Sequence, residues 1–111
     1  MHAIDMMMKV GCTTARGIRH WEDLGLLGEV ERSNGGDRRY TDEQLDRAKI
    51  IAAAQFGSFS LEEAKQMLGE WSEEAYEAIG SRLFSQIELA QRLLEELPRP
   101  PAEKPGAEYD L

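Results

Sequence analysis

Two adjacent arginines and a tyrosine, Arg38, Arg39 and Tyr40, lie between a glycine-rich turn and the start of a predicted helix. An arginine guanidinium forms charge-assisted and often bidentate hydrogen bonds with phosphate or carboxylate oxygens. The pair therefore has the chemistry needed to grip a phosphate backbone. The alternative is a solvated strand end, in which the same guanidinium groups pair with Asp37 or Asp42.

The sequence lacks the residue patterns of a catalytic site or a metal site. No nucleophile–base pair, carboxylate dyad or phosphate-binding loop occurs, so we do not expect an enzyme. His2, Cys12 and His20 have no metal-ligand spacing, and we expect neither a metal nor another cofactor. A single cysteine excludes an internal disulfide framework and fits a reducing compartment. No apolar run reaches membrane-spanning length and the first residues lack the layout of a signal peptide, so we expect a cytoplasmic protein.

Charge is unevenly distributed along the 111 residues. The net charge is −8, which at first argues against nucleic acid as a partner. Residues 1–40 contain six basic and six acidic side chains, whereas residues 41–111 contain seven basic and fifteen acidic ones. An anionic ligand can therefore approach the first third of the chain, while the acidic remainder turns nonspecific polyanion contacts away. This distribution permits DNA binding without demonstrating it.

The first 40 residues predict two short helices followed by a hairpin. Residues 4–10 form a predicted helix whose methionines make its apolar side and which Gly11 closes. A threonine cap then starts a second helix over residues 15–24, and Gly25 ends it. Alternating residues around an Asn-Gly-Gly centre predict a β-hairpin in residues 26–40. Two short helices joined by a tight turn resemble a helix-turn-helix.

Capping residues mark the starts of three further helices, namely Thr41 with Gln44, Ser60 with Glu63, and Ser72. The last helix, over residues 72–97, has an apolar stripe at steps of three and four residues: Tyr76, Ile79, Leu83, Ile87, Ala90, Leu94 and Leu97. A domain of this size is too small to cover such a stripe, so we expect a dimer seam of the coiled-coil type. Packing against its own domain is the alternative.

Three blocks of the sequence together resemble the MerR family of bacterial transcription regulators: residues 18–27 (IRHWEDLGLL), 38–45 (RRYTDEQL) and 59–68 (FSLEEAKQML). The resemblance extends over residues 4–68. It implies a mostly α fold, with a winged helix-turn-helix DNA-binding domain in residues 1–70. A dimerisation helix in residues 72–97, paired as an antiparallel coiled coil, and a disordered tail in residues 98–111 would follow. We expect a short form of the family without a sensor domain.

The function implied by this resemblance is that of a homodimeric, sequence-specific transcription regulator in the cytoplasm, at the nucleoid. Its partner would be double-stranded DNA, as a palindromic promoter operator. Whether the tail from Pro98 binds RNA polymerase or nothing is left open. The alternative function is an acidic, protein-binding adaptor on a MerR-like scaffold that no longer binds DNA. The net charge of −8 favours that alternative, and the intact Arg-Arg-Tyr block opposes it.

By the same resemblance, the DNA-binding residues lie on the second helix and the wing: Thr14, Arg16, Gly17, Arg19, His20, Arg38, Arg39 and Tyr40. We expect Arg16 to read a base, because arginine to guanine is the commonest specific contact. Arg19 and one wing arginine are expected to hold phosphates, which fix the register of the protein on DNA. Tyr40 is expected to place its ring under the wing and its hydroxyl near a phosphate. His20 either donates to a phosphate or is an exposed histidine without a role.

Cys12 occupies the position at which the family has a turn glycine. We expect a small buried thiol there, with redox sensing as an alternative that no other residue supports. Metal-sensing members carry cysteines near the long helix, and this sequence has none there. We therefore do not expect a metal inducer.

Overall fold

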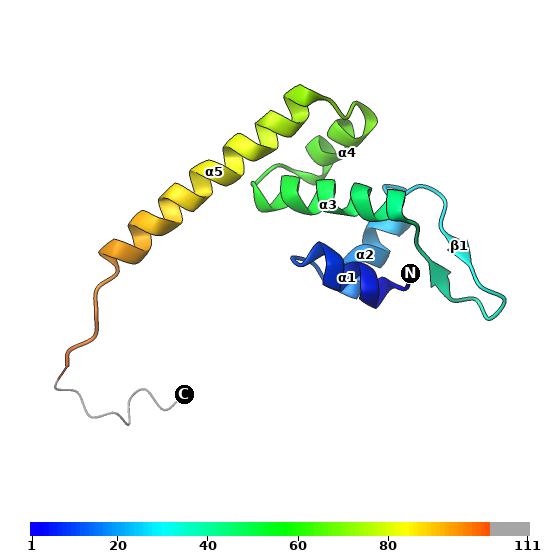
Figure 1. Ribbon diagram of the computed structural model, residues 1–111, viewed down its shortest axis with the longest axis horizontal. Helices are drawn as coiled ribbons and strands as arrows, with labels where there is room; N and C mark the ends of the chain where they lie inside the picture. Colours follow the sequence, from blue (N-terminus) through cyan, green and yellow to red (C-terminus); the bar gives the residue numbers. More distant parts are fainter. Residues whose placement is uncertain (103–111) are drawn as a thin grey trace.

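The computed structural model describes residues 1–102 and is mostly helical, with one small hairpin (Figure 1). Its elements in chain order are α1 (Ala3–Val10), α2 (Ala15–Asp23), β1 (Glu31–Arg32), β2 (Arg38–Arg39), α3 (Asp42–Phe56), α4 (Leu61–Gly69) and α5 (Glu73–Glu96). This order confirms the predicted mostly α fold, in which a helix-turn-helix and a wing precede a long last helix. Residues 103–111, most of the predicted tail, lie outside the described residues.

The predicted caps start the helices where the sequence places them. Thr14 caps α2, because its Oγ1 accepts the Gly17 N–H at 3.0 Å, and Ser72 caps α5 in the same way. In α4 the Ser60 backbone N–H donates to Glu63 Oε1 at 2.9 Å, and this hydrogen bond is the main cause of a lowered pKa at the Glu63 carboxyl. Local hydrogen bonding thus explains these helix starts.

The turn between α1 and α2 corrects one expectation. Gly11 ends α1 in the left-handed conformation, with φ of 89°, which glycine adopts without the steric cost of a Cβ atom. The turn glycine is therefore Gly11, and the next residue is already outside the helix. The expectation of a buried thiol at Cys12 is wrong, because this side chain is exposed.

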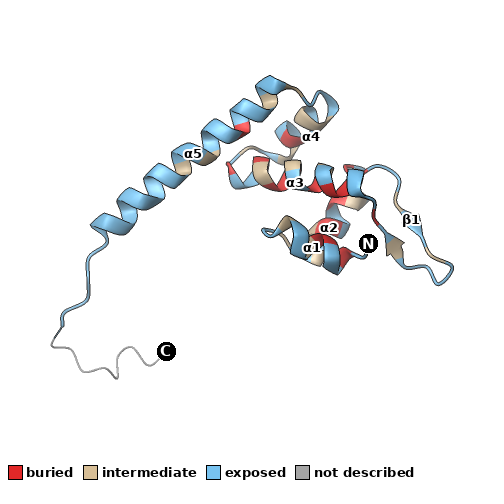
Figure 2. Cartoon of the chain, viewed as in Figure 1, coloured by how far each residue is buried: buried red, intermediate tan, exposed pale blue. Residues whose placement is uncertain are grey.

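The main core lies where α1, α2 and α3 meet, beside the wing (Figure 2). Its fully buried side chains are Met6, Ile18, Leu27 and Ile51. Of the three consecutive methionines, Met6 is buried, Met7 is half-buried and Met8 is 71% exposed. Consecutive helical residues point about 100° apart, so they cannot all form one apolar side, as the sequence interpretation assumed.

A second, smaller cluster joins α5 to the domain. Ile79 packs with Ala54 of α3 and Ala64 of α4, and all three are buried. Beyond this contact α5 runs away from the domain (Figure 1). The helix has 24 residues, or about 36 Å at 1.5 Å per residue, and most of it is exposed. The predicted stripe is therefore covered at one end by its own domain and open over the rest.

Gln44 is a buried polar residue with two separate tasks. Its Oε1 accepts the Thr41 N–H at 2.8 Å, and its Nε2 donates to the Glu29 carbonyl at 2.8 Å. The side chain thereby caps α3 and ties the segment before the wing to that helix. Both polar ends are satisfied, which a buried amide requires.

We expect Gln44→Glu to destabilise the domain by about 2 kcal/mol, because a carboxylate keeps the cap and cannot donate to the Glu29 carbonyl. The matched control is Glu63→Gln in α4, where the side chain is exposed and serves only as a cap, with an expected effect within about 0.5 kcal/mol. Urea denaturation followed by circular dichroism measures both. Equal losses in the two variants would contradict a second task for Gln44.

Candidate nucleic-acid interface

The α2 helix has one buried and one exposed face. Ile18 and Trp21 are buried in the core, whereas Thr14, Arg16, Arg19 and His20 are exposed. Five of the predicted DNA-binding residues therefore lie on α2 or at its cap, four of them exposed and Gly17 half-buried. At Gly17 a Cβ atom would clash with the Thr13 hydroxyl, which lies against the backbone there. A flat, cationic helix face of this kind fits the major groove, which admits an α-helix.

The wing is a short antiparallel hairpin, in which Glu31 pairs with Arg39 and Arg32 pairs with Arg38. Its tip is closed by the Ser33 N–H donating to the Asp37 carbonyl at 2.8 Å. Neighbouring residues of a strand point to opposite faces, so Arg38 and Arg39 are separated by the hairpin itself. The two arginines therefore have different surroundings.

Glu22, near the end of α2, binds the inner face of the wing. Its Oε1 accepts hydrogen bonds from Arg38 Nε at 2.7 Å and from the Tyr40 hydroxyl at 2.9 Å. Its Oε2 lies 3.5 Å from Arg32 Nη2, and the Glu22 side chain is only 12% exposed. Among residues 1–102, both ion pairs end on this one carboxylate. Glu22 thus fixes both strands of the wing to the predicted recognition helix.

Sequence reasoning did not assign a role to Glu22. The available signal was its position beside buried Trp21 and one helical turn after Ile18, which places an acidic group at the edge of the core. A carboxylate at such a boundary needs a cation or a hydrogen-bond donor, and the arginines of the wing can provide both. The alternative considered for Arg38 was pairing with Asp37 or Asp42, and the structure instead pairs it with Glu22.

Tyr40 is placed differently from the expectation. Its ring is buried at 3% exposure under the wing, as expected, and its hydroxyl is taken by Glu22. Burial, followed by the hydrogen bond and the negative charge of Glu22, raises the pKa of Tyr40 from 10.0 to about 12. The hydroxyl is therefore a structural donor within the domain, held neutral over the whole physiological pH range.

Arg39 is the exposed arginine of the wing, and no ion pair holds it within residues 1–102. Its Nη1 lies within hydrogen-bonding distance of the His2 ring, whose accepting nitrogen must be unprotonated. A neutral partner leaves the positive charge of Arg39 uncompensated. Of the two arginines, Arg39 therefore has the free charge, and Arg38 organises the wing.

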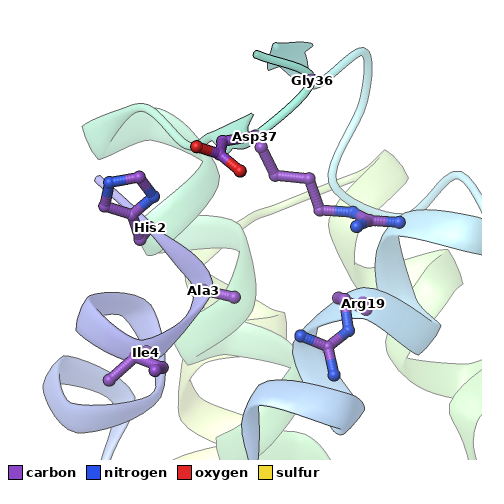
Figure 3. Close-up of a pocket in the computed structure, with 7 residues that line it drawn as sticks. His2, Ala3, Ile4, Arg19, Gly36 and Asp37 are labelled. Atoms are coloured by element: carbon purple, nitrogen blue, oxygen red, sulfur yellow. The ribbon is translucent and has the colours of Figure 1, made fainter. Parts of the chain in front are cut away.

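An open cavity of about 300 Å³ lies between the start of α1, the exposed face of α2 and the wing. Figure 3 shows Arg19 extending into this region from α2, with His2 on the α1 side and Asp37 on the wing side. The cavity joins Arg19 to the wing, so the cationic face of α2 and the wing form one surface. Its size and the Arg19 guanidinium suit a phosphate group, while Asp37 limits where an anion can sit.

In residues 1–102, no group of three histidine, cysteine, aspartate or glutamate side chains is placed to hold a metal ion. No helix in the same range is long and apolar enough to cross a membrane.

The arrangement of α1, α2, wing and α3 defines a winged helix-turn-helix protein. The model of the MerR HTH family regulatory proteins matches residues 8–71, which is more than half of the chain. This chain belongs to the MerR family. The resemblance noted in the sequence is thereby confirmed.

Several curated relatives share this region. The chain is 40% identical over 57 residues to the HTH-type transcriptional activator TipA of Streptomyces coelicolor, covering 51% of this chain and 22% of TipA. It is 38% identical over 65 residues to the HTH-type transcriptional regulator CueR of Vibrio cholerae, covering 59% of this chain and 47% of CueR. With the mercuric resistance operon regulatory protein of Bacillus cereus it shares 34% over 84 residues, covering 74% of this chain and 64% of that protein. The chain thus spans less than two thirds of these relatives.

A solved structure shows the same fold. It is the crystal structure of HiNmlR, described as a MerR family regulator lacking the sensor domain, bound to promoter DNA. The superposition has a TM-score of 0.70 and covers 86% of this chain and 78% of the other, at 24% sequence identity. The long last helix is thereby part of a known architecture.

The raised pKa of Tyr40 leads to a pH-dependent prediction. A folded-state pKa of about 12 against an ordinary value of 10.0 contributes stability that is fully present below pH 10 and is lost as the pH rises towards 12. We expect Tyr40→Phe to cost about 1–2 kcal/mol at pH 7 and to remove this alkaline loss. Denaturation curves at several pH values between 7 and 11.5 measure it, with Tyr76→Phe, an exposed ring, as the control. Parallel profiles for wild type and Tyr40→Phe would refute the assignment.

Proposed function

We propose that this chain is a sequence-specific regulator of transcription that binds double-stranded DNA as a homodimer on a palindromic promoter operator. The observation that carries the proposal is the cationic surface formed by the exposed face of α2 and the cavity between Arg19, His2 and the wing, with Arg39 held against His2 at the edge of that cavity. The relatives TipA and CueR, which are named as transcription regulators, support it, as does the DNA-bound state of HiNmlR. The protein-binding adaptor has only the net charge of −8 in its favour, and none of these relatives is named as such a protein.

The proposed contacts follow from the surroundings of each side chain. Arg16 is exposed and without an acidic partner among the described residues, so it is the side chain proposed to read a base in the major groove. Arg19 and Arg39 are proposed to hold phosphates on either side of the cavity, and His20 and the Thr14 hydroxyl lie beside them on α2. Gly17 lets the backbone approach the groove. Arg38 and Tyr40 support the wing through Glu22 and are not proposed as phosphate ligands.

The chain is proposed to comprise a DNA-binding domain in residues 1–70 and a dimerisation helix in residues 72–97. The exposed apolar residues of α5 supply the seam, including Tyr76, Ile87 and Leu94 of the predicted stripe, at 63%, 55% and 73% exposure. Ala90 and Leu97 are exposed on the same stripe. Ile79 and part of Leu83 pack in their own domain, so they contribute to the attachment of α5 instead.

Dimerisation through α5 explains how two recognition helices can reach successive major grooves on a palindrome. An antiparallel pairing places the two domains at opposite ends of the paired helices. Action at a promoter brings the complex next to RNA polymerase, which is a second partner under this proposal. Such an operator places the protein on the nucleoid, in the cytoplasm.

Selection of bound duplexes from a random DNA pool tests the proposed function, and a palindromic consensus is the expected result. On that consensus, Arg39→Ala should weaken binding to every sequence and make the dependence of log K on log salt less steep by about one for each half-site, because one phosphate contact is lost. Arg16→Ala should relax the preference at one position of each half-site, at a cost of about 1–3 kcal/mol.

Arg92→Ala, an exposed position near the end of α5, is the control and should change neither property. Equal losses for Arg39→Ala and Arg16→Ala with an unchanged salt slope would count against the assigned roles. A wild-type protein that ignores duplexes of every sequence at low ionic strength would end the DNA-binding proposal and return the adaptor to consideration.

The seam has its own prediction. Ile87→Asp places a charge in the apolar face that a partner helix would cover, so we expect the dimer to dissociate at micromolar concentration while the winged domain stays folded. Ser85→Asp, two residues away on another side of the same helix, is the control and should stay dimeric. Sedimentation velocity measures the mass of each, and a dimeric Ile87→Asp would contradict the seam.

A further inference from the structure

The middle of α5 is fastened to the turn between α3 and α4 by two polar side chains. Arg82 Nη1 donates to the Gly57 carbonyl at 2.9 Å, and its guanidinium carbon lies 4.1 Å from the centre of the Phe59 ring. One helical turn further, Gln86 Nε2 donates to Ser58 Oγ at 3.3 Å. We call these five residues the α5 junction. Guanidinium groups stack on aromatic faces and bond carbonyls in this way with well-defined direction.

The turn is shaped to receive Arg82. A Cβ atom on Gly57 would lie 3.1 Å from Arg82 Cγ and 3.4 Å from the Ala53 carbonyl oxygen, so a side chain there would require the arginine stem to shift by a few tenths of an ångström. The next residue, Ser58, has a φ of 71° and is the one non-glycine residue with positive φ within residues 1–102. This left-handed residue closes α3, because the Phe59 N–H donates to the Ala54 carbonyl at 2.9 Å and the Ser58 N–H donates to the Gln55 carbonyl at 3.0 Å. The turn that receives Arg82 is thereby fixed to the end of α3 by backbone hydrogen bonds.

The junction adds polar contacts beside the apolar attachment of α5 and one helical turn beyond it. The apolar contact with the domain consists of buried Ile79 and half-buried Leu83, both in the first half of the helix. Small, smooth partners such as Ala54 and Ala64 allow a helix to pivot, whereas a hydrogen bond and a cation–π contact have a preferred direction. Arg82 and Gln86 add two directional contacts along the axis, which defines the angle of the helix.

The angle of α5 matters because the helix is long. Over the roughly 21 Å from Arg82 to Glu96, a change of about 10° at the junction displaces the far end by about 4 Å, which is comparable to the rise of one base pair. In a symmetric dimer the same change occurs twice, once at each domain. The direction of α5 therefore determines where the two recognition helices stand relative to each other.

We propose that Arg82 is a positioning residue that sets the angle between α5 and the winged domain, and so sets the spacing of operator half-sites that the dimer accepts. This inference rests on the dimeric, DNA-binding function proposed above. Arg82 itself does not touch DNA under this proposal. It acts through the Gly57 carbonyl and the Phe59 ring, which hold the helix in one direction.

The first test measures the angle without DNA. Cys12 is the sole cysteine and is exposed, so a second cysteine introduced by Glu96→Cys at the end of α5 gives a pair of sites for spin labels. Doubly labelled chain, diluted with an excess of unlabelled chain, is examined by pulsed electron paramagnetic resonance. We expect one narrow distance distribution in the parent and in Arg92→Ala, and a clearly broadened one in Arg82→Ala. Gly57→Ala, whose Cβ would push against Arg82, should also shift or broaden it.

The second test measures how the affinity of the dimer for DNA depends on the spacing of the operator half-sites. Duplexes carry the selected operator with the half-site spacing changed by one or two base pairs in either direction. Wild type and Arg92→Ala should prefer one spacing by about tenfold or more, as two linked sites require matched geometry. Arg82→Ala should bind all spacings within about threefold of one another, with an unchanged salt slope and with sedimentation showing a dimer. Arg82→Lys, which lacks the planar fork, should lie between them.

The outcomes separate this inference from the proposed function. A distance distribution in Arg82→Ala as narrow as in the parent overturns the inference, whatever the DNA results. A uniform loss of affinity at every spacing, with the spacing profile unchanged, also overturns it, because it would show a merely structural role. A wild type that binds no duplex refutes the proposed function and with it the spacing claim, while a broadened distribution in Arg82→Ala would still establish Arg82 as the residue that fixes α5.

Discussion

The wing depends on one carboxylate. Each of its strands has only two residues, and a two-stranded hairpin of that size has little stability of its own in water. Glu22 compensates by binding Arg38 and Tyr40 at 2.7 and 2.9 Å and by lying 3.5 Å from Arg32, all from a largely buried position on α2. Because the carboxylate belongs to the recognition helix, wing and helix keep a fixed relation. The same interaction compensates the charge of Arg38, whereas Arg39 has no ion-pair partner within residues 1–102.

Much of this architecture could be predicted from the sequence, because its signals are local. The caps at Thr41, Ser60 and Ser72 and the closing glycine of α1 act within one helical turn, so a reader of the sequence sees both partners of each interaction. The role of Glu22 could not be read in this way, since its partners lie 10 to 18 residues away. The exposure of Cys12 was missed for a related reason: the family pattern suggested its position, whereas the backbone of Gly11 determines it.

The surroundings of α5 could also be predicted only in part from the sequence. A stripe at steps of three and four residues predicts an apolar face, and it does not say which surface covers each part of it. In the structure Ile79 belongs to its own domain and Leu94 is open, although both lie on one stripe. The division depends on where the chain turns after α4, which is a tertiary property. The α5 junction was likewise invisible, because Arg82 reaches a backbone carbonyl 25 residues earlier, and no sequence pattern marks a carbonyl acceptor.

The placement of acidic residues also has a kinetic consequence. Residues 41–111 carry fifteen acidic and seven basic side chains, while the surface around Arg16, Arg19 and Arg39 is cationic, so each molecule is an electric dipole. As such a molecule diffuses towards a polyanionic rod, the field rotates its cationic end inward before any contact is made. Productive collisions become more frequent, and a molecule that arrives backwards is repelled. Under the proposed function, an overall negative protein searches long stretches of duplex quickly in this way without being held on them.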